Sequence, residues 1–301
     1  MTWRYHSGEL EAQGRAGVQE SARRLGRTIR SSIPLAAQDF LGSQRMAVVG
    51  TVDADRRVWA SLLTGPAGFM QAVDERTVRI DTFPVPGDSL VENIRARPEV
   101  GMLVIDLATR RRMRLNGKVS VLHNGSMYVE AREVYSNCPK YIQARVISAD
   151  RDQKQQIRAA HHATSLSPMQ QDWIAKADTF FIASVHPEAG ADASHRGGHP
   201  GFIRIANAET LLWPDYPGNT MFQTLGNILV NPSVGLLFIE FERGDTLQLT
   251  GRARVLWDTD RASEFPGAER IIEFHIEQVI EIAGANPFRW RLVERSPFNP
   301  A

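Results

Sequence analysis

The chain has 301 residues, of which 43% are hydrophobic and 23% charged, a composition typical of a soluble globular protein with enough chain for a large core. Lysine and arginine number 35 against 34 aspartates and glutamates, and this net charge of about +1 argues against nucleic acid or an anionic membrane surface as a partner. The single cysteine, Cys138, excludes an intrachain disulfide and a zinc site made of several cysteines.

Residues 1–40 are predicted to form an N-terminal helical arm. Residues 8–29 combine helix-forming residues with alternating charge, and AAQDFLGSQ at 36–44 predicts a short helix that leads into the first strand. The opening residues lack the apolar segment of a secretory signal, and no apolar run approaches the roughly 18 residues of a membrane helix. We therefore expect a cytoplasmic protein without a membrane segment.

The most informative feature of the sequence is an internal repeat. Three segments recur in the same order at an offset of 133 or 134 residues, and Asn93 and Asn227 fall in step with them. The matching pairs are WASLLTGPAGF at 59–69 with DASHRGGHPGF at 192–202, RPEVGMLVID at 97–106 with NPSVGLLFIE at 231–240, and RLNGKVSVL at 114–122 with QLTGRARVL at 248–256. Ordered matches at a nearly constant offset indicate two homologous halves.

Each half is predicted to be rich in β-strands. MAVVGTV at 46–52 and FFIASV at 180–185 are short apolar runs with β-branched and aromatic residues. Residues 113–122 and 247–256 alternate apolar and polar residues, which is typical of half-buried strands. Residues 88–98 and 219–232 carry apolar residues at helical spacing and end at a proline, which predicts one helix in each half. Short strands with few helices favour two small barrels.

The polar, charged segment 133–162 is predicted to be helical and to connect the two halves. The expected organisation is therefore a first barrel at 41–150, a helical linker at 151–178 and a second barrel at 179–301. The pair His161-His162 lacks a third ligand pattern, so a solvated helix face is favoured over a metal site there. We expect no metal.

The repeated segments resemble the pyridoxamine 5′-phosphate oxidase-like superfamily of FMN-binding split barrels. The resemblance is most specific over residues 194–255, is looser in the first half, and includes NCPKYIQ at 137–143. In this superfamily two barrels usually pair as a homodimer with FMN between them, so the duplication implies an intrachain pseudo-dimer. The arginine-lysine phosphate strand and the C-terminal substrate motif of the vitamin B6 oxidase are not found. The resemblance therefore supports flavin binding better than pyridoxamine phosphate as substrate.

The resemblance implies that Ser194, His195, Arg196 and Gly197 hold the FMN phosphate. Arg196 offers a fork of donors to a dianion, Ser194 adds a hydroxyl, and Gly197 allows close approach of the backbone. His195 would assist or stack on the flavin. From the residues alone, a solvated hairpin in which Arg196 pairs with a surface acid explains the segment equally well.

Further cofactor contacts are expected from residues 214–227 and from NCPKYIQ at 137–143. In residues 214–227, Asn219 is predicted to be the N-cap of a helix whose free N–H groups favour a phosphate. The alternatives there are a simple turn with Met221 in the core and Asn227 as a turn cap. The full set of candidates is Asp215, Tyr216, Asn219, Thr220, Met221, Asn227, Lys140 and Tyr141. Cys138 is either a reactive thiol or a small buried apolar residue, the commoner case.

The first copy of the repeat lacks this anchor. Leu62 and Leu63 stand where His195 and Arg196 stand in the second copy, which predicts one FMN per chain. Trp59 and Ser61 would face the flavin or a substrate across the pseudo-dimer, although barrel core is the simpler interpretation of Trp59.

The function implied by the resemblance is that of an FMN-dependent oxidoreductase. Electrons would pass between NAD(P)H or a redox partner protein and a small acceptor, and no separate acid-base motif is required. Association of two chains into a homodimer is compatible with the sequence. The alternative is a non-enzymatic flavin or haem carrier of the same fold.

Overall fold

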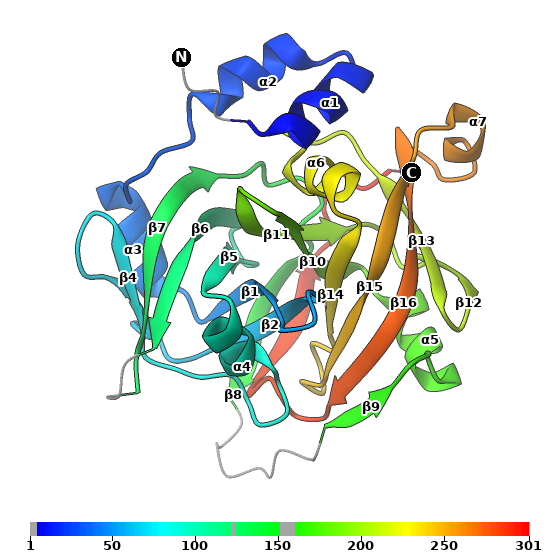
Figure 1. Ribbon diagram of the computed structural model, residues 1–301. Coiled ribbons are helices and arrows are strands. Elements are labelled where there is room, and N and C mark those ends of the chain that lie inside the picture. The colour runs from blue at the N-terminus through cyan, green and yellow to red at the C-terminus, as the bar shows by residue number, and fades with distance from the viewer. Residues whose placement is uncertain (1–4, 122–124, 151–159, 301) are drawn as a thin grey trace.

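The computed structural model describes residues 5–121, 125–150 and 160–300 (Figure 1). The first barrel contains β1 (Met46–Val52), β2 (Val58–Thr64), β3 (Met70–Ala72), β4 (Thr77–Ile80), α4 (Leu90–Ala96), β5 (Glu99–Asp106), β6 (Arg111–Val121) and β7 (Met127–Ser136). The second contains β10 (Thr179–His186), β11 (Gly190–Gly197), β12 (Arg204–Asn207), β13 (Thr210–Asp215), α6 (Gln223–Val230), β14 (Ser233–Ile239), β15 (Thr246–Leu256), α7 (Thr259–Ala262) and β16 (Arg270–Ile282).

The two barrels have the same topology. The strand orders β2-β1-β5-β6-β7-β4-β3 and β11-β10-β14-β15-β16-β13-β12 correspond strand for strand, and all pairs are antiparallel. Even the bulges correspond, because the register shifts at Asn116/Gly117 in β6 and at Thr250/Gly251 in β15. The predicted mainly β fold with two tandem barrels is confirmed.

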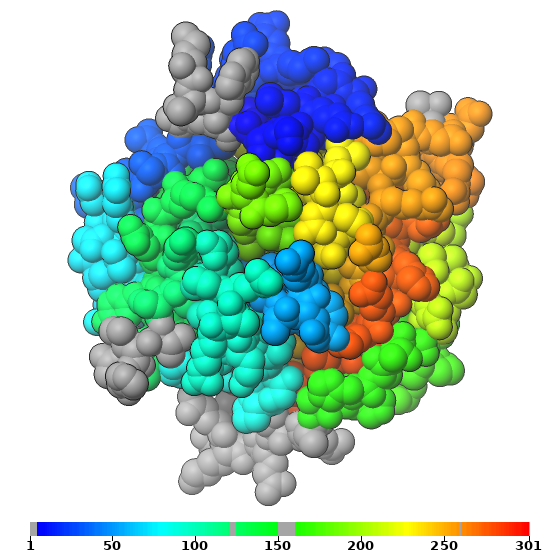
Figure 2. All heavy atoms as spheres, viewed as in Figure 1, coloured from blue at the N-terminus to red at the C-terminus, as the bar shows by residue number. Residues whose placement is uncertain are grey.

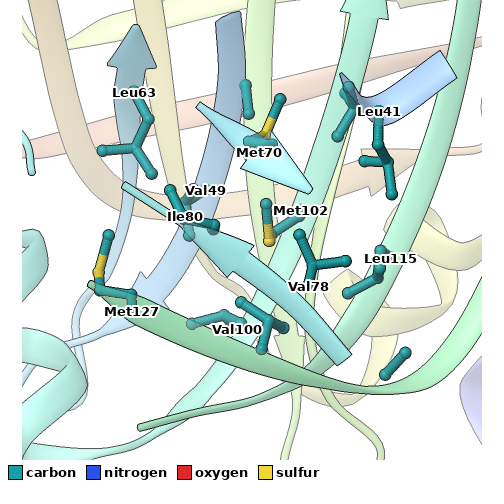
Figure 3. Close-up of a cluster of buried hydrophobic side chains, with 14 of the residues drawn as sticks. Leu41, Val49, Leu63, Met70, Val78, Ile80, Val100, Met102, Leu115 and Met127 are labelled. Atoms are coloured by element: carbon teal, nitrogen blue, oxygen red, sulfur yellow. The ribbon is translucent and has the colours of Figure 1, made fainter. Parts of the chain in front are cut away.

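Each barrel has its own apolar core, and a third core joins them. The first core contains Leu41, Leu63 and Met102, which are among the side chains labelled in Figure 3. The shared core brings residues such as Val48 of β1 against Phe181 of β10. A common buried core means that the two barrels form a pseudo-dimer within one chain, as predicted.

Glycines let the barrels approach closely at two related places. A Cβ on Gly101 of β5 would lie 2.4 Å from the Cα of Asp192 in β11, and a Cβ on Gly235 of β14 would lie 2.7 Å from the Cα of Trp59 in β2. Backbone therefore packs on backbone across the interface, twice, in a pseudo-twofold arrangement. This contact sets β11 beside the strands of the first barrel and β2 beside those of the second.

The N-terminal arm is helical, as expected, but consists of separate helices. These are α1 (Ser7–Arg15), α2 (Gln19–Gly26) and α3 (Leu35–Ser43). In Figure 1 α1 and α2 lie above α6, and in Figure 2 the blue arm covers the yellow segment. Gln13 of α1 donates a hydrogen bond to the carbonyl of Met221 at 3.0 Å, which ties the arm to the second barrel.

The helical prediction for residues 133–162 is wrong wherever the structure describes them. Residues 133–136 belong to β7, and the following strands are β8 (Ala144–Asp150) and β9 (His161–Ala163). β8 pairs with β17 (Phe288–Glu294) near the C-terminus, and β9 pairs with β16. These distant partners decide the conformation, which local polarity could not reveal. Residues 151–159 of the predicted linker lie outside the described residues, and α5 (Pro168–Lys176) is its helical part.

His161 and His162 are both exposed on β9, so they lie on a solvated strand and not on the predicted helix. Within the described part of the chain, no helix is long and apolar enough to cross a membrane.

Candidate functional site

A cavity of about 190 Å³ lies at the junction of the two barrels. Its walls come from β6 of the first barrel, β11 and β13 of the second, and the start of α6. Ala16 and Val18, in the turn between α1 and α2, line its remaining side. The cavity is therefore an inter-barrel site with the N-terminal arm at its edge.

Arginines from both barrels converge on this cavity. Arg112 and Arg114 come from β6, and Arg196 comes from β11. Burial, together with the charges of Arg114 and Arg196, lowers the pKa of Arg112 to about 9. The pKa of Arg196 is also lowered, first by burial. Among the described residues, neither Arg112 nor Arg196 forms an ion pair within 4.0 Å, although Asp215 and Asp192 favour the charge of Arg196 from farther away.

Arg114 connects the two barrels. Its guanidinium lies 3.0 Å from Asp192 and donates to the Ser194 hydroxyl and to Tyr135. The Thr224 hydroxyl, in the first turn of α6, lies 3.2 Å from that of Ser194. A serine, a helix start and an arginine therefore meet at one point of the cavity wall.

His195 is 4% exposed and stacks edge-on against Phe181, with ring centroids 5.7 Å apart. Burial and the nearby arginines hold the pKa of His195 well below its usual range, so the imidazole is neutral. Neither ring nitrogen has a hydrogen-bond partner among the described residues, and the Nε of Arg114 also lacks one. These are unpaired polar atoms in a cavity wall, which a polar ligand would satisfy.

The outer wall is formed by tyrosines and by a second ion pair. The Tyr141 hydroxyl donates to the carbonyl of Pro217 at 3.0 Å, and its ring lies 5.1 Å from that of Tyr216. Asp215 is 8% exposed and pairs with Arg270 at 2.8 Å. Its carboxylate therefore neutralises one cation of the site.

Backbone strain gathers around the cavity. Tyr141, Thr220 and Phe222 have φ values of +66°, +60° and +63°, a region that bulky residues seldom adopt. Residues held in such conformations tend to cluster at functional sites.

The backbone of the two predicted phosphate-binding segments differs in part from the prediction. Ser194 to Gly197 belong to strand β11, and the N–H of the next residue, Gly198, donates to the carbonyl of Asp178 at 3.1 Å. The helix α6 begins at Gln223 with Phe222 as N-cap, whereas the predicted cap, Asn219, accepts a hydrogen bond from the N–H of Met221.

Most of the predicted site residues line the cavity. They are Ser194, His195, Arg196, Gly197, Asp215, Tyr216, Asn219, Thr220, Lys140 and Tyr141. Met221 is instead packed against Tyr5 and Tyr135, in agreement with the core alternative. Asn227 bonds Ser184 at 2.9 Å, as Asn93 bonds Thr51 in the first barrel, so both asparagines attach a helix to a strand.

Several polar residues of the wall were not predicted from the sequence, among them Arg112, Arg114, Thr224 and Arg270. A signal for the first two exists, because arginines two apart on an alternating strand share one face. Cys138 is half-buried in the wall, where its carbonyl accepts a hydrogen bond from Arg112 at 2.8 Å.

The corresponding residues of the first barrel are packed away from the cavity. Leu63 lies in the first core (Figure 3), and Leu62 lies in the shared core. Trp59 is 3% exposed, packs against Ile280 and donates from its ring nitrogen to Asp53, which supports the core interpretation.

Three solved structures match between 36% and 41% of this chain. The HupZ protein of Group A Streptococcus is 15% identical, with a TM-score of 0.32, and the match covers 38% of this chain and 91% of HupZ. A FAD-binding protein from Mesorhizobium loti is 15% identical, with a TM-score of 0.28 and coverages of 41% and 96%. An F420 reductase is 15% identical, with a TM-score of 0.27 and coverages of 36% and 91%.

A search of curated proteins found no match. The family model for pyridoxamine 5′-phosphate oxidase, in contrast, matches the chain twice in tandem, at residues 33–161 and 166–290. The two matches follow the duplication seen in the strand order, and together they cover most of the chain. The protein therefore belongs to the pyridoxamine 5′-phosphate oxidase family, with two copies of the family's domain in one chain.

Proposed function

We propose that the protein is an FMN-binding flavoprotein whose inter-barrel cavity holds the phosphate end of the cofactor. The observation that carries the proposal is the convergence of Arg112, Arg114 and Arg196, of which the first and last have no ion-pair partner among the described residues. Arg112 and Arg196 are half-buried, burial lowers the pKa of both, and the charges of Arg114 and Arg196 lower that of Arg112 further. Cations in such a setting favour a counter-charge, and a phosphate dianion supplies it.

The residues of the cavity fit this group. Hydroxyls, guanidinium groups and the first turn of a helix are typical phosphate donors. The unpaired atoms of Arg114 and His195 show that the wall offers further hydrogen bonds to a ligand. Since pockets for whole small-molecule ligands measure about 300–1,000 Å³, the cavity of about 190 Å³ suits the phosphate end better than the entire cofactor.

We assign Arg196 and Arg112 as the main phosphate ligands, with Ser194 and Thr224 as hydroxyl donors. Lys140, Tyr141 and Tyr216 would bound the ligand on the outer side, and His195 would act as a neutral wall residue and hydrogen-bond partner. Ala16 and Val18 of the arm would exclude water. When bound, FMN supplies an electron-accepting ring, so the protein needs to bind and orient it more than to provide acid-base catalysis.

The proposed reaction is electron transfer from NAD(P)H or a redox partner protein to a small acceptor. A carrier of flavin or haem is the alternative function for the same fold. The absorption spectrum of the purified protein, its released ligand and its reduction by nicotinamides distinguish these functions. Flavin absorbance, release of FMN identified by mass, and bleaching by NADH or NADPH without oxygen are expected for the oxidoreductase.

A flavin spectrum that no nicotinamide or redox protein bleaches would indicate a carrier, and a Soret band would indicate haem. A colourless protein that cannot be reconstituted with FMN would refute flavin binding altogether.

A further inference from the structure

The first barrel contains a counterpart of the anion-binding wall, and that counterpart is filled. Ser61 on β2 corresponds to Ser194 on β11, since each pairs with the matching residue of the neighbouring strand, Val49 and Ile182. The Ser61 hydroxyl donates to Oδ1 of Asp88 at 2.7 Å. The serine that faces the cavity in one barrel therefore faces a carboxylate in the other.

The other contacts of Asp88 correspond as well. The N–H of Leu90, at the start of α4, donates to Oδ1 of Asp88 at 2.9 Å, and Leu90 corresponds to Thr224 at the start of α6. The amide of Gln248 on β15 donates to Oδ2 at 2.8 Å, and Gln248 corresponds to Arg114 on β6.

Both clusters cross the barrel interface in the same way. Ser61 of the first barrel meets Gln248 of the second, and Ser194 of the second meets Arg114 of the first. The three donor positions around Asp88 are thus the pseudo-twofold equivalents of the Ser194 hydroxyl, the helix start at Thr224 and the Arg114 guanidinium. Phe222 stands at the sequence position of Asp88, and the carboxylate that Arg114 contacts at 3.0 Å, Asp192, corresponds to Trp59 and not to Asp88.

We propose that the first-barrel cluster is a degenerate anion site plugged by the Asp88 carboxylate, and that Asp88 marks where an anionic oxygen binds Ser194, Thr224 and Arg114 in the cavity. The inference rests on the proposed function and extends it, because it states which residues contact one particular oxygen of the ligand. It also gives two reasons for the prediction of one ligand per chain. Asp88 fills the first-barrel site, and the arginines of the cavity have no counterpart there.

The loss of charge around the plug supports this assignment. Leu63 and Thr246 are the residues that correspond in the repeat to Arg196 and Arg112 of the cavity. A singly charged internal carboxylate needs fewer cations than a phosphate dianion, and neutral donors suffice for it. The cavity keeps the arginines, and the buried Nε of Arg114 still lacks a partner there.

The direct test is a crystal structure of the wild-type protein with inorganic phosphate. After superposition of the two halves, a phosphate oxygen should coincide with a carboxylate oxygen of Asp88 and lie within about 3.2 Å of the Ser194 hydroxyl. Phosphate bound only by Arg112 and Arg196, away from Ser194 and Thr224, would overturn the inference. This probe is independent of flavin, so a colourless protein could still confirm it.

A solution test uses Asp88→Ala, which empties the plug, and Asp88→Asn, which keeps it filled. At pH 7.5, sodium formate should raise the Tm of Asp88→Ala by at least about 2 °C more than sodium chloride of equal ionic strength. Formate that binds the inter-barrel cavity stabilises all three proteins alike, so this excess over sodium chloride should be at least about 2 °C larger in Asp88→Ala than in wild type or Asp88→Asn. Equal formate effects in all three proteins, or none in Asp88→Ala, would mean that Asp88 only caps α4. If Asp88→Ala does not fold, the phosphate structure decides.

Discussion

Arg112 and Arg196 line one cavity from different barrels, and among the described residues neither has an ion-pair partner within 4.0 Å. The charge of Arg196 contributes to lowering the pKa of Arg112 to about 9, after burial and the charge of Arg114. Such mutual repulsion destabilises the empty cavity and is relieved by an anionic ligand. The two arginines therefore lead to predictions about the affinity for FMN and about the pH dependence of that affinity.

Arg196→Ala should weaken FMN binding by roughly 10- to 100-fold, since a hydrogen bond to a charged group contributes about 1.5–3 kcal/mol. The measurement is quenching of FMN fluorescence by the apoprotein. Leu63→Ala, at the equivalent position of the first barrel, is the matched control. It should lower the free energy of unfolding by about 2–5 kcal/mol and leave FMN affinity unchanged. Equal FMN affinity in wild type and Arg196→Ala would contradict the phosphate role.

The pKa of Arg112 predicts that FMN affinity falls as the pH rises through about 9. Below this pH the guanidinium is charged and attracts the phosphate, and above it the empty protein must first take up a proton. Arg112→Gln should bind FMN more weakly at pH 7.5 but lose less affinity between pH 8 and 10. Parallel pH profiles for both proteins would show that another group titrates. Fluorescence titrations at each pH provide the comparison.

The repeat and the alternation of apolar residues were enough to predict two barrels. The matches at Asn93 and Asn227 correspond to a real common contact, because each side chain bonds a hydroxyl on the first strand of its barrel. The conformation of β8 could not be predicted in the same way. Its sequence, ARVISAD, mixes apolar and polar residues, and its partner, β17, lies near the C-terminus, so tertiary pairing decides its conformation.

The internal repeat also made part of the site predictable. Arg196 and Ser194 stand out in the second copy because the first copy lacks the arginine. Arg112 and Arg114 lie on a strand of the other barrel, and no local pattern states which strand they will face. The closure of the first-barrel site by Asp88 depends on contacts with Ser61 and Gln248 that only the assembled pseudo-dimer creates.

Glu9 should make the protein less stable as the pH rises from about 4.5 to 8. Burial, with the charges of Glu133 and Asp192, raises the pKa of Glu9 to about 8, despite hydrogen bonding to the N–H of His6. The unfolded chain releases this proton near pH 4.5, so folding costs up to about 1.4 kcal/mol more per pH unit across this window. Above pH 8 the effect levels off.

Glu9→Gln keeps an acceptor for the N–H of His6 and removes the titration. Urea unfolding should give this variant a higher free energy of unfolding than wild type at pH 8, and a similar value near pH 4.5. The low pKa of His6, about 4, acts in the opposite direction in acid and is common to both proteins. A constant difference across the whole range would rule out Glu9 as the titrating group.

Gly226→Ala should detach the N-terminal arm. A Cβ at this position of α6 would lie 2.5 Å from the backbone nitrogen of Glu9, and backbone atoms of α1 cannot move aside without displacing the helix. Overpacking of this kind costs about 1–3 kcal/mol. Because Ala16 and Val18 line the cavity, displacement of α1 should also speed the release of FMN measured by stopped-flow fluorescence.

Limited trypsin digestion followed by intact mass should show faster cleavage within the arm of Gly226→Ala than of wild type. Gly42→Ala in α3 is the control, because its Cβ would meet nothing within 4 Å and alanine favours a helix. It should be cleaved and should release FMN at the wild-type rates. If Gly226→Ala matched Gly42→Ala in both measurements, the docking of the arm would not depend on this contact.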